Sequence, residues 1–286
     1  MGRLSARPLG GHIGAVIEGV DLRDFGEETY EALRSALLEY EVIFFRGAHI
    51  DDDTHMAVAR RFGRVSLFPV FALLGETEPA LQVLHDTPES PPETDHWHTD
   101  VTWLPEPPAL GFLRAVRIPE RGGDTIWGSM TAAYEALSTK IQELVEGLEV
   151  HHDMDTFIRN AENKLGEEVR RRGLGRILRE AYPEEVHHPL VRTHPETGRR
   201  ALYIGGDADQ PILGLADHEA QAVRDLVSRQ IEQPRFQIRW SWQEGDFAIW
   251  DERSTVHRAV SDHYPLEREM RRCVVDGDRP FFKPSP

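Results

Sequence analysis

The sequence predicts a single, mainly β domain of the α+β class, in which strands form a sandwich or barrel and helices gather outside it. Two observations carry this prediction. Short apolar segments rich in Val, Ile, Phe and Trp recur along the chain, separated by turns that contain glycine and proline. No internal repeat or shift in composition divides the 286 residues, a length at which β-rich enzymes are often one domain.

The first part of the chain is expected to alternate strands and helices. His12–Leu22 alternates apolar residues with polar or small ones, as one or two short strands do. Residues 27–39 carry an apolar stripe at helical spacing, and Val42–Gly47 is a buried strand that ends at its glycine. Asp51–Thr54 offers N-caps for a helix that ends before Gly63.

The rest of the chain continues this pattern with one exception. Residues 153–182 enclose a polar, charge-rich stretch with little core character, which we interpret as an insertion or lid. A hairpin is expected over 189–204, and a helix with an apolar stripe begins at Asp217. The other expected strands cover 109–118, 125–127, 236–242, 247–250, 254–260 and 271–275, and short helices cover 131–136 and 138–146.

Composition limits the classes of partner. The formal net charge of −16 at pH 7 argues against nucleic acid and an anionic membrane surface, because both attract clustered Lys and Arg. Met1–Gly11 lacks the apolar core of a signal peptide, and no apolar run reaches the length of a membrane span. Cys273 is the single cysteine, which excludes an intrachain disulfide. We expect a cytoplasmic homo-oligomer.

The segment Trp97–Trp103 contains the first candidate site residues. Its Val, Thr and Trp residues favour a strand, and side chains at positions i and i+2 of a strand project from the same face. His98 and Asp100 would then point at one spot, as two ligands of a divalent metal do. One more histidine would complete a facial triad with open coordination positions, which suits non-haem Fe(II) oxygenases.

Two other His-x-Asp triplets compete with this one. His49-Ile50-Asp51 lies between a strand end and a helix start, where capping is the simpler role. His151-His152-Asp153 leads into the polar stretch, where its histidines are expected to be solvated or hydrogen-bonded.

The last strands supply the remaining candidates. His257 lies among strand-forming residues, Arg268 follows eleven positions later, and Arg272 four positions after that. One interpretation is a core histidine with two surface arginines. The other is a third metal ligand, His257, with Arg268 as the anchor of an anionic cosubstrate.

Four segments occur along the chain in a recognisable order: Trp97–Thr102, Gly122–Thr125, His188–Pro195 and Trp250–Arg253. Together with the spacing of His257 and Arg268, they resemble the Fe(II)/2-oxoglutarate-dependent dioxygenases related to taurine dioxygenase and 2,4-dichlorophenoxyacetate dioxygenase. The resemblance covers nearly the whole chain.

The resemblance implies a double-stranded β-helix, or jelly roll, with flanking helices. It implies that His98, Asp100 and His257 bind Fe(II), which 2-oxoglutarate then chelates. Arg268 and the Thr125 hydroxyl would bind the far carboxylate of this cosubstrate, to which a guanidinium can donate two hydrogen bonds. The reaction would consume O₂, convert 2-oxoglutarate to succinate and CO₂, and hydroxylate a small anionic organic substrate.

The substrate contacts of the family are partly changed in this sequence. Arg272 matches the arginine that binds a sulfonate, but the family's asparagine falls on Thr94, and its histidine and tyrosine fall on Phe68 and Phe71. Val101 is expected beside these residues. These changes remove polar partners, and burying an ammonium group without a partner for its charge is unfavourable. We therefore expect a substrate more apolar than taurine, such as an alkyl sulfate, an alkyl sulfonate or an aryloxyalkanoate.

Two other classes of protein fit the same ligand residues. A zinc-dependent hydrolase could use the same triad but would not need Arg268. A non-catalytic jelly-roll binding protein would hold its ligand without turnover. Turnover of 2-oxoglutarate distinguishes a dioxygenase from both.

Overall fold

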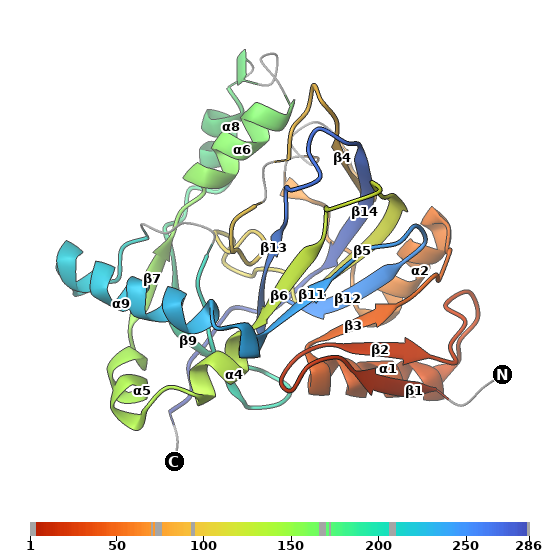
Figure 1. The fold of residues 1–286 in the computed structure, drawn as a ribbon. Helices are drawn as coiled ribbons and strands as arrows, with labels where there is room; N and C mark the ends of the chain where they lie inside the picture. Colours follow the sequence, from red (N-terminus) through yellow and green to blue (C-terminus); the bar gives the residue numbers. More distant parts are fainter. Residues whose placement is uncertain are drawn as a thin grey trace.

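The computed structural model describes residues 4–69, 71, 76–92, 95–165, 170–171, 173–205 and 210–284. The largest sheet has seven strands (Figure 1). β2 and β3 pair in parallel, and the other neighbours are antiparallel. In spatial order the strands are β1 (Ser5–Pro8), β2 (Ala15–Glu18), β3 (Val42–Phe45), β12 (Phe247–Asp251), β5 (Leu110–Arg117), β14 (Arg268–Val275) and β4 (Gln82–Asp86).

A second, antiparallel sheet of three strands packs against the first through aromatic side chains. Its order is β11 (Gln237–Trp240), β6 (Thr125–Ser129) and β13 (Thr255–Ala259). Phe44 of β3 stacks on Trp240 of β11 with ring centroids 4.3 Å apart, and meets Trp127 of β6 at 5.3 Å. These contacts join the two sheets into one aromatic core.

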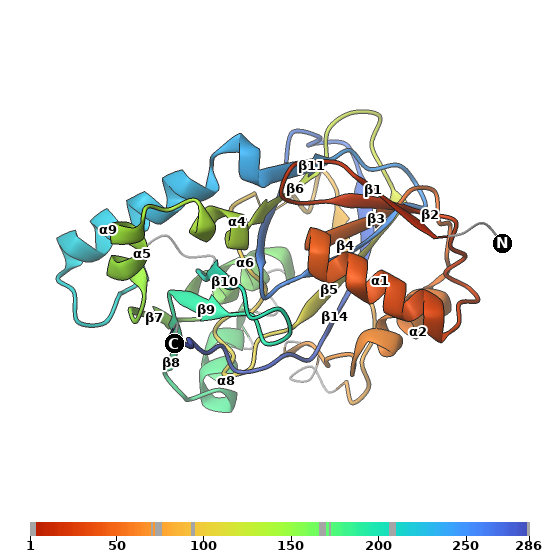
Figure 2. The same ribbon diagram turned by 90° about the horizontal axis from the view of Figure 1, so that it is seen from below.

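Strand β3 shows why the large sheet is buried on both faces. Its four residues are all apolar and buried, as is usual for a strand covered on two sides. Because side chains alternate along a strand, Val42 and Phe44 enter the aromatic core, whereas Ile43 and Phe45 enter a second core. That second core lies beneath α1 (Glu27–Tyr40) and α2 (Asp52–Phe62), which cover the outer face of the sheet (Figures 1 and 2).

The start of α2 follows the capping rule that the sequence suggested. The Asp51 carboxylate accepts a hydrogen bond from the backbone N–H of Thr54 at 2.8 Å, which satisfies a free donor of the first helical turn.

The other helices lie beyond the small sheet. α4 (Met130–Glu135), α5 (Thr139–Val145) and α9 (Asp217–Ile231) gather at the end opposite to α1, as Figure 2 shows. They enclose a third core with the paired strands β9 (Val191–Thr193) and β10 (Arg200–Leu202). β7 (Glu149–His152) pairs with β8 (Val186–Pro189), and a 3₁₀ turn covers Pro234–Phe236.

The polar stretch of residues 153–182 contains more structure than its composition indicated. It forms α6 (Asp155–Leu165) and α8 (Leu174–Ala181), which contact each other. Ile158 of α6 and Leu178 of α8 are buried in one cluster with Val101 and Trp103. A few apolar residues at helical spacing are therefore enough to attach this charged segment to the loop that carries Asp100.

Among the described residues, no helix combines the length and the apolar character that crossing a membrane requires. The described part of the chain is thus a mixed structure in which sheets predominate and helices lie around them.

Candidate metal and cosubstrate site

Three side chains from two distant parts of the sequence meet at β13. His98, Asp100 and His257 each offer one ligand atom, and these atoms all lie within 4.8 Å of one another. Asp100 is 4% exposed and His257 is 7% exposed. This is the one group of three or more metal-ligating side chains that the described residues bring together.

The backbone explains how these residues meet. His98 and His257 form an isolated antiparallel bridge, in which the N–H of each donates to the carbonyl of the other at 2.9 Å. The chain then turns: Val101 has a φ of 43°, and the N–H of Leu104 donates to the Val101 carbonyl at 3.0 Å. The expected strand over Trp97–Trp103 is therefore wrong, because pairing stops after one bridge.

The proton positions suit a divalent cation. His98 Nδ1 lies 2.9 Å from the His96 carbonyl, which can only accept, so Nε2 is left as the free ligand atom. Burial lowers the pKa of His98 and, together with the neighbouring His98 ring, holds the pKa of His257 well below its usual value. Burial alone would raise the pKa of Asp100, but Arg272 and the two imidazoles hold it below the usual value. Neutral imidazoles and a carboxylate are the forms that bind metal.

One atom of the group lacks a partner. Asp100 Oδ2 is buried and has no hydrogen-bond partner in the described part of the chain. Buried carboxylate oxygens are rarely left in this state. A cation at the centre of the group would satisfy it, so the residues present fit a metal with two histidine ligands and one carboxylate ligand.

Arg268 is fixed at one side of the same cavity. It is 5% exposed, and its Nε donates to the Gly123 carbonyl at 2.9 Å. Gly123 has a φ of 74°, and a Cβ on it would come within 3.0 Å of the Arg268 side chain, so glycine is needed here. Burial lowers the pKa of Arg268 to about 10, which still leaves it charged at neutral pH.

Thr125 lies next to this guanidinium. Its Oγ1 accepts from the Trp242 Nε1–H at 3.0 Å and lies 3.5 Å from Nη2 of Arg268. Because the oxygen already accepts, the hydroxyl hydrogen remains available as a donor. Arg268 and Thr125 together form a cationic, donor-rich corner suited to a carboxylate.

Arg272 also lines the cavity but is already engaged. Its Nη1 donates to Asp100 Oδ1 at 2.9 Å, and its Nε donates to Gln82 Oε1 at 3.0 Å. Its guanidinium carbon lies 5.5 Å from the centre of the Phe68 ring. Arg272 therefore connects a candidate metal ligand with the apolar wall of the cavity, a contact that the sequence did not indicate.

The cavity has a volume of about 320 Å³, and part of its wall is aromatic. Phe68, Phe71 and Val101 are among the residues that line it, and Thr94 lies outside the described residues. The Phe68 ring packs edge-on against Phe157 of α6, with centroids 5.8 Å apart. The loop of Phe68 and α6 thus contact each other at the wall of the cavity.

Several lining residues were missed in the sequence. His96 stands two positions before His98, and this His-x-His-x-Asp spacing was the available signal. Gln82 of β4 carried no signal, because its neighbours in the cavity are distant in sequence. Phe157 and Asn160 are three positions apart on α6 and so lie on one face of this helix. Recognising that this face points to the cavity would have identified both residues.

Neither competing triplet places a histidine in this cavity, although Asp153 of the second triplet is among the lining residues. His49 and His151 are not among the residues that line this cavity. The side chain of His152 is buried, and its Nδ1 lies 2.9 Å from Thr102 Oγ1, so it is hydrogen-bonded, one of the two outcomes expected.

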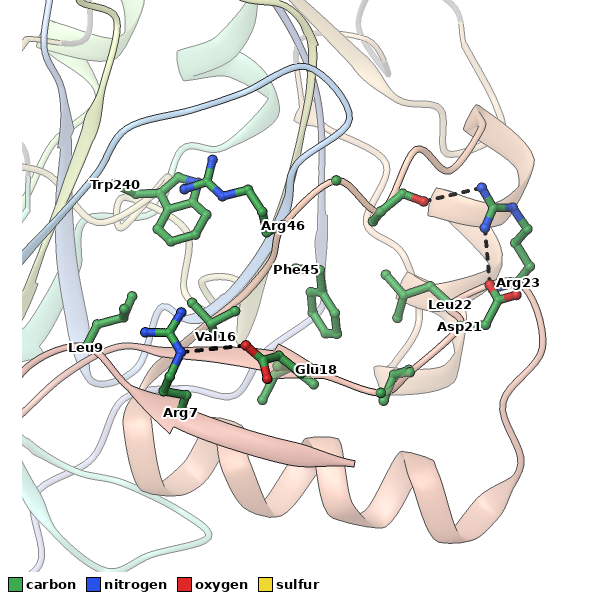
Figure 3. Close-up of a pocket in the computed structure, with 15 residues that line it drawn as sticks. Arg7, Leu9, Val16, Glu18, Asp21, Leu22, Arg23, Phe45, Arg46 and Trp240 are labelled. Atoms are coloured by element: carbon green, nitrogen blue, oxygen red, sulfur yellow. Dashed lines mark hydrogen bonds and ion pairs between the residues drawn. The ribbon is translucent and has the colours of Figure 1, made fainter. Parts of the chain in front are cut away.

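A second cavity, of about 690 Å³, lies beside β2 and β3, near Trp240 (Figure 3). Each of its three arginines already forms an ion pair with a carboxylate, so their charges are balanced within the protein. The pairs are Arg7 with Glu18 and Arg23 with Asp21, which Figure 3 shows, and Arg46 with Asp246.

Comparison with known proteins agrees with this geometry. The chain is 32% identical over 278 residues to an alkylsulfatase of Acinetobacter baylyi, covering 96% of this chain and 86% of the relative. It is 33% identical over 279 residues to an alpha-ketoglutarate-dependent sulfate ester dioxygenase of Pseudomonas putida, covering 97% and 91%. The solved structure of a taurine dioxygenase from Burkholderia xenovorans superposes with a TM-score of 0.77 at 32% identity, covering 97% and 92%.

The family model gives the assignment. Residues 5–274 match the model described as "Taurine catabolism dioxygenase TauD, TfdA family", which spans nearly the whole chain. The resemblance seen in the sequence motifs is thereby confirmed, and the chain belongs to this family of dioxygenases.

Proposed function

We propose that the enzyme hydroxylates a sulfate ester or a related anion with an apolar body, and that it does so in the 320 Å³ cavity. It is a dioxygenase of the Fe(II)- and 2-oxoglutarate-dependent class that acts on anionic organic compounds. The main support is that the His-Asp-His group, two arginines and an aromatic wall all open on one cavity.

His98, Asp100 and His257 would hold the Fe(II) ion. When bound, Fe(II) supplies the activation of O₂ on which oxidation of both 2-oxoglutarate and the substrate depends. One oxygen atom of O₂ enters succinate as CO₂ leaves, and the other enters the substrate. Arg268 and Thr125 would hold the far carboxylate of 2-oxoglutarate, so that its 2-oxo acid end points toward the three ligands.

Arg272 would bind the anionic head of the substrate. The body of the substrate would lie along Phe68, Phe71 and Val101. We propose Thr94 as a further substrate contact. Aromatic walls favour an alkyl or aryl body over the ammonium group of taurine. Hydroxylation of the carbon that bears a sulfate ester gives an unstable product, which separates into an aldehyde and sulfate.

The test is turnover with Fe(II), 2-oxoglutarate and O₂ across a panel of alkyl sulfates, alkyl sulfonates, aryloxyalkanoates and taurine. We expect succinate to form in step with aldehyde and sulfate for alkyl sulfates of medium length. Release of alcohol and sulfate without consumption of 2-oxoglutarate would instead favour the zinc hydrolase. Binding without any turnover would favour the non-catalytic protein.

The proposal extends to the architecture of the protein. We infer that the two apposed sheets form a double-stranded β-helix. We also infer that residues 1–286 are one domain, in which the segment 153–182 covers the cavity. Packing of Ile158 and Leu178 against Val101 supports the second point. A cytoplasmic location and a homo-oligomeric state stay predictions, and size-exclusion chromatography with light scattering would test the latter.

A further inference from the structure

We propose that Glu252 is a positioning residue of the metal centre, which holds Asp100 and His257 in place for the cation. The inference rests on the proposed metal site and concerns a residue that is not itself a ligand. Glu252 directly follows β12 and is 1% exposed.

The carboxylate of Glu252 touches the backbone of one ligand residue and faces the ring of another. Its Oε2 accepts the backbone N–H of Asp100 at 3.3 Å. The same oxygen lies 4.0 Å from Nδ1 of His257. It therefore stands where the turn after His98 meets β13, at the junction of two segments that supply ligands.

A third contact fixes the orientation of this carboxylate. Glu252 Oε1 accepts from the Trp250 Nε1–H at 2.7 Å. The Trp250 ring in turn packs edge-on against the His257 ring, with centroids 5.2 Å apart. The indole that holds this carboxylate therefore also packs against the ligand residue His257.

His257 Nδ1 supplies the reason for an acidic residue here. This buried atom has no hydrogen-bond partner among the described residues. A metal-bound histidine usually donates its other ring N–H to a carboxylate or a carbonyl, which sets the ring orientation and strengthens it as a ligand. Glu252 Oε2 is an acceptor that faces this nitrogen at 4.0 Å, a distance too long for a hydrogen bond.

Burial and the neighbouring Asp100 carboxylate raise the pKa of Glu252 well above its usual value. Glu252 therefore acts on the two ligand residues through its contacts rather than through a fixed negative charge.

The experiment measures binding of Co(II), a spectroscopic substitute for Fe(II), to the full chain without O₂ chemistry. Glu252→Gln replaces the carboxyl group by an amide of nearly the same size, which keeps one oxygen acceptor and replaces the other oxygen by an NH₂ donor. We expect it to weaken Co(II) binding about 10- to 100-fold, the usual effect of losing such a partner, and to shift the visible absorption bands of the bound ion. Glu41→Gln is the matched control: Glu41 is 3% exposed and bonds to Ser129 and Thr131, away from the cavity.

Glu252→Asp covers the case in which the glutamine variant does not fold. It keeps the carboxyl group but withdraws it by one methylene, and we expect weaker Co(II) binding with an unchanged circular dichroism spectrum. Co(II) affinity and bands equal to those of the wild type in a folded Glu252 variant would overturn the inference alone. Failure of the wild type to bind one Co(II) would overturn the proposed metal site as well.

Discussion

Replacement of Arg268 by lysine tests the cosubstrate corner of the cavity. The Arg268 Nε is committed to the Gly123 carbonyl, and Nη2 lies near Thr125 Oγ1, so the remaining N–H groups can form a fork toward a carboxylate. One ammonium group cannot both satisfy Gly123 and donate to two carboxylate oxygens. Loss of one hydrogen bond to a charged group costs about 1.5–3 kcal/mol. We therefore expect the half-saturating concentration of 2-oxoglutarate to rise about 10- to 150-fold.

The assay is succinate formation against 2-oxoglutarate at saturating substrate. Arg271→Lys serves as the control, because Arg271 is on the same strand but pairs with Glu269 and lies near Asp52. We expect its half-saturation to match that of the wild type. An unchanged half-saturation in Arg268→Lys would refute the role of Arg268, and an equal rise in both variants would attribute the effect to the strand.

Three further predictions follow from the site and its surroundings. Asp100→Ala should reduce Mn(II) affinity at least tenfold and abolish turnover, as isothermal titration and succinate assays would show, since two imidazoles alone do not form a facial triad. Each methylene added to an alkyl sulfate should raise kcat/KM about three- to fourfold until the cavity is full, at roughly 0.8 kcal/mol per buried CH₂; taurine outperforming hexyl sulfate would contradict this. Burial raises the pKa of Glu41 to about 7, so the wild type loses stability as pH rises from about 4.5 to 7. At pH 8 the free energy of unfolding of Glu41→Gln, measured by urea denaturation, should therefore exceed that of the wild type by up to roughly 3 kcal/mol. Near pH 4 the two should not differ.

The segment around His98 shows how far local sequence rules reach. A strand was expected from its Val, Thr and Trp residues, but the backbone forms a single bridge to His257 and then turns. The two side chains converge all the same, because the bridge and the turn bring them to one place. The strand propensity of a residue takes effect only where a neighbouring strand is available for pairing. Beyond His98 the backbone has no such partner among the described residues, because the pairing is an isolated bridge.

The segment 153–182 gives the complementary case. Its charges indicated little contribution to a core, yet α6 and α8 bury Ile158 and Leu178 against Val101 and Trp103. Only a few apolar residues are needed on one face of a short helix, and a high charge content conceals them. The other face stays charged and exposed.

The sequence alone was sufficient for the class of reaction and the family. Four ordered segments, together with the spacing of His257 and Arg268, indicated both. Tertiary structure decided how these groups are held. Arg272 contacts Asp100 across 172 positions of sequence, and Glu252 contacts it across 152. Contacts of this kind depend on which strands become neighbours in the sheets, and neither periodicity nor propensity along a single segment contains that information.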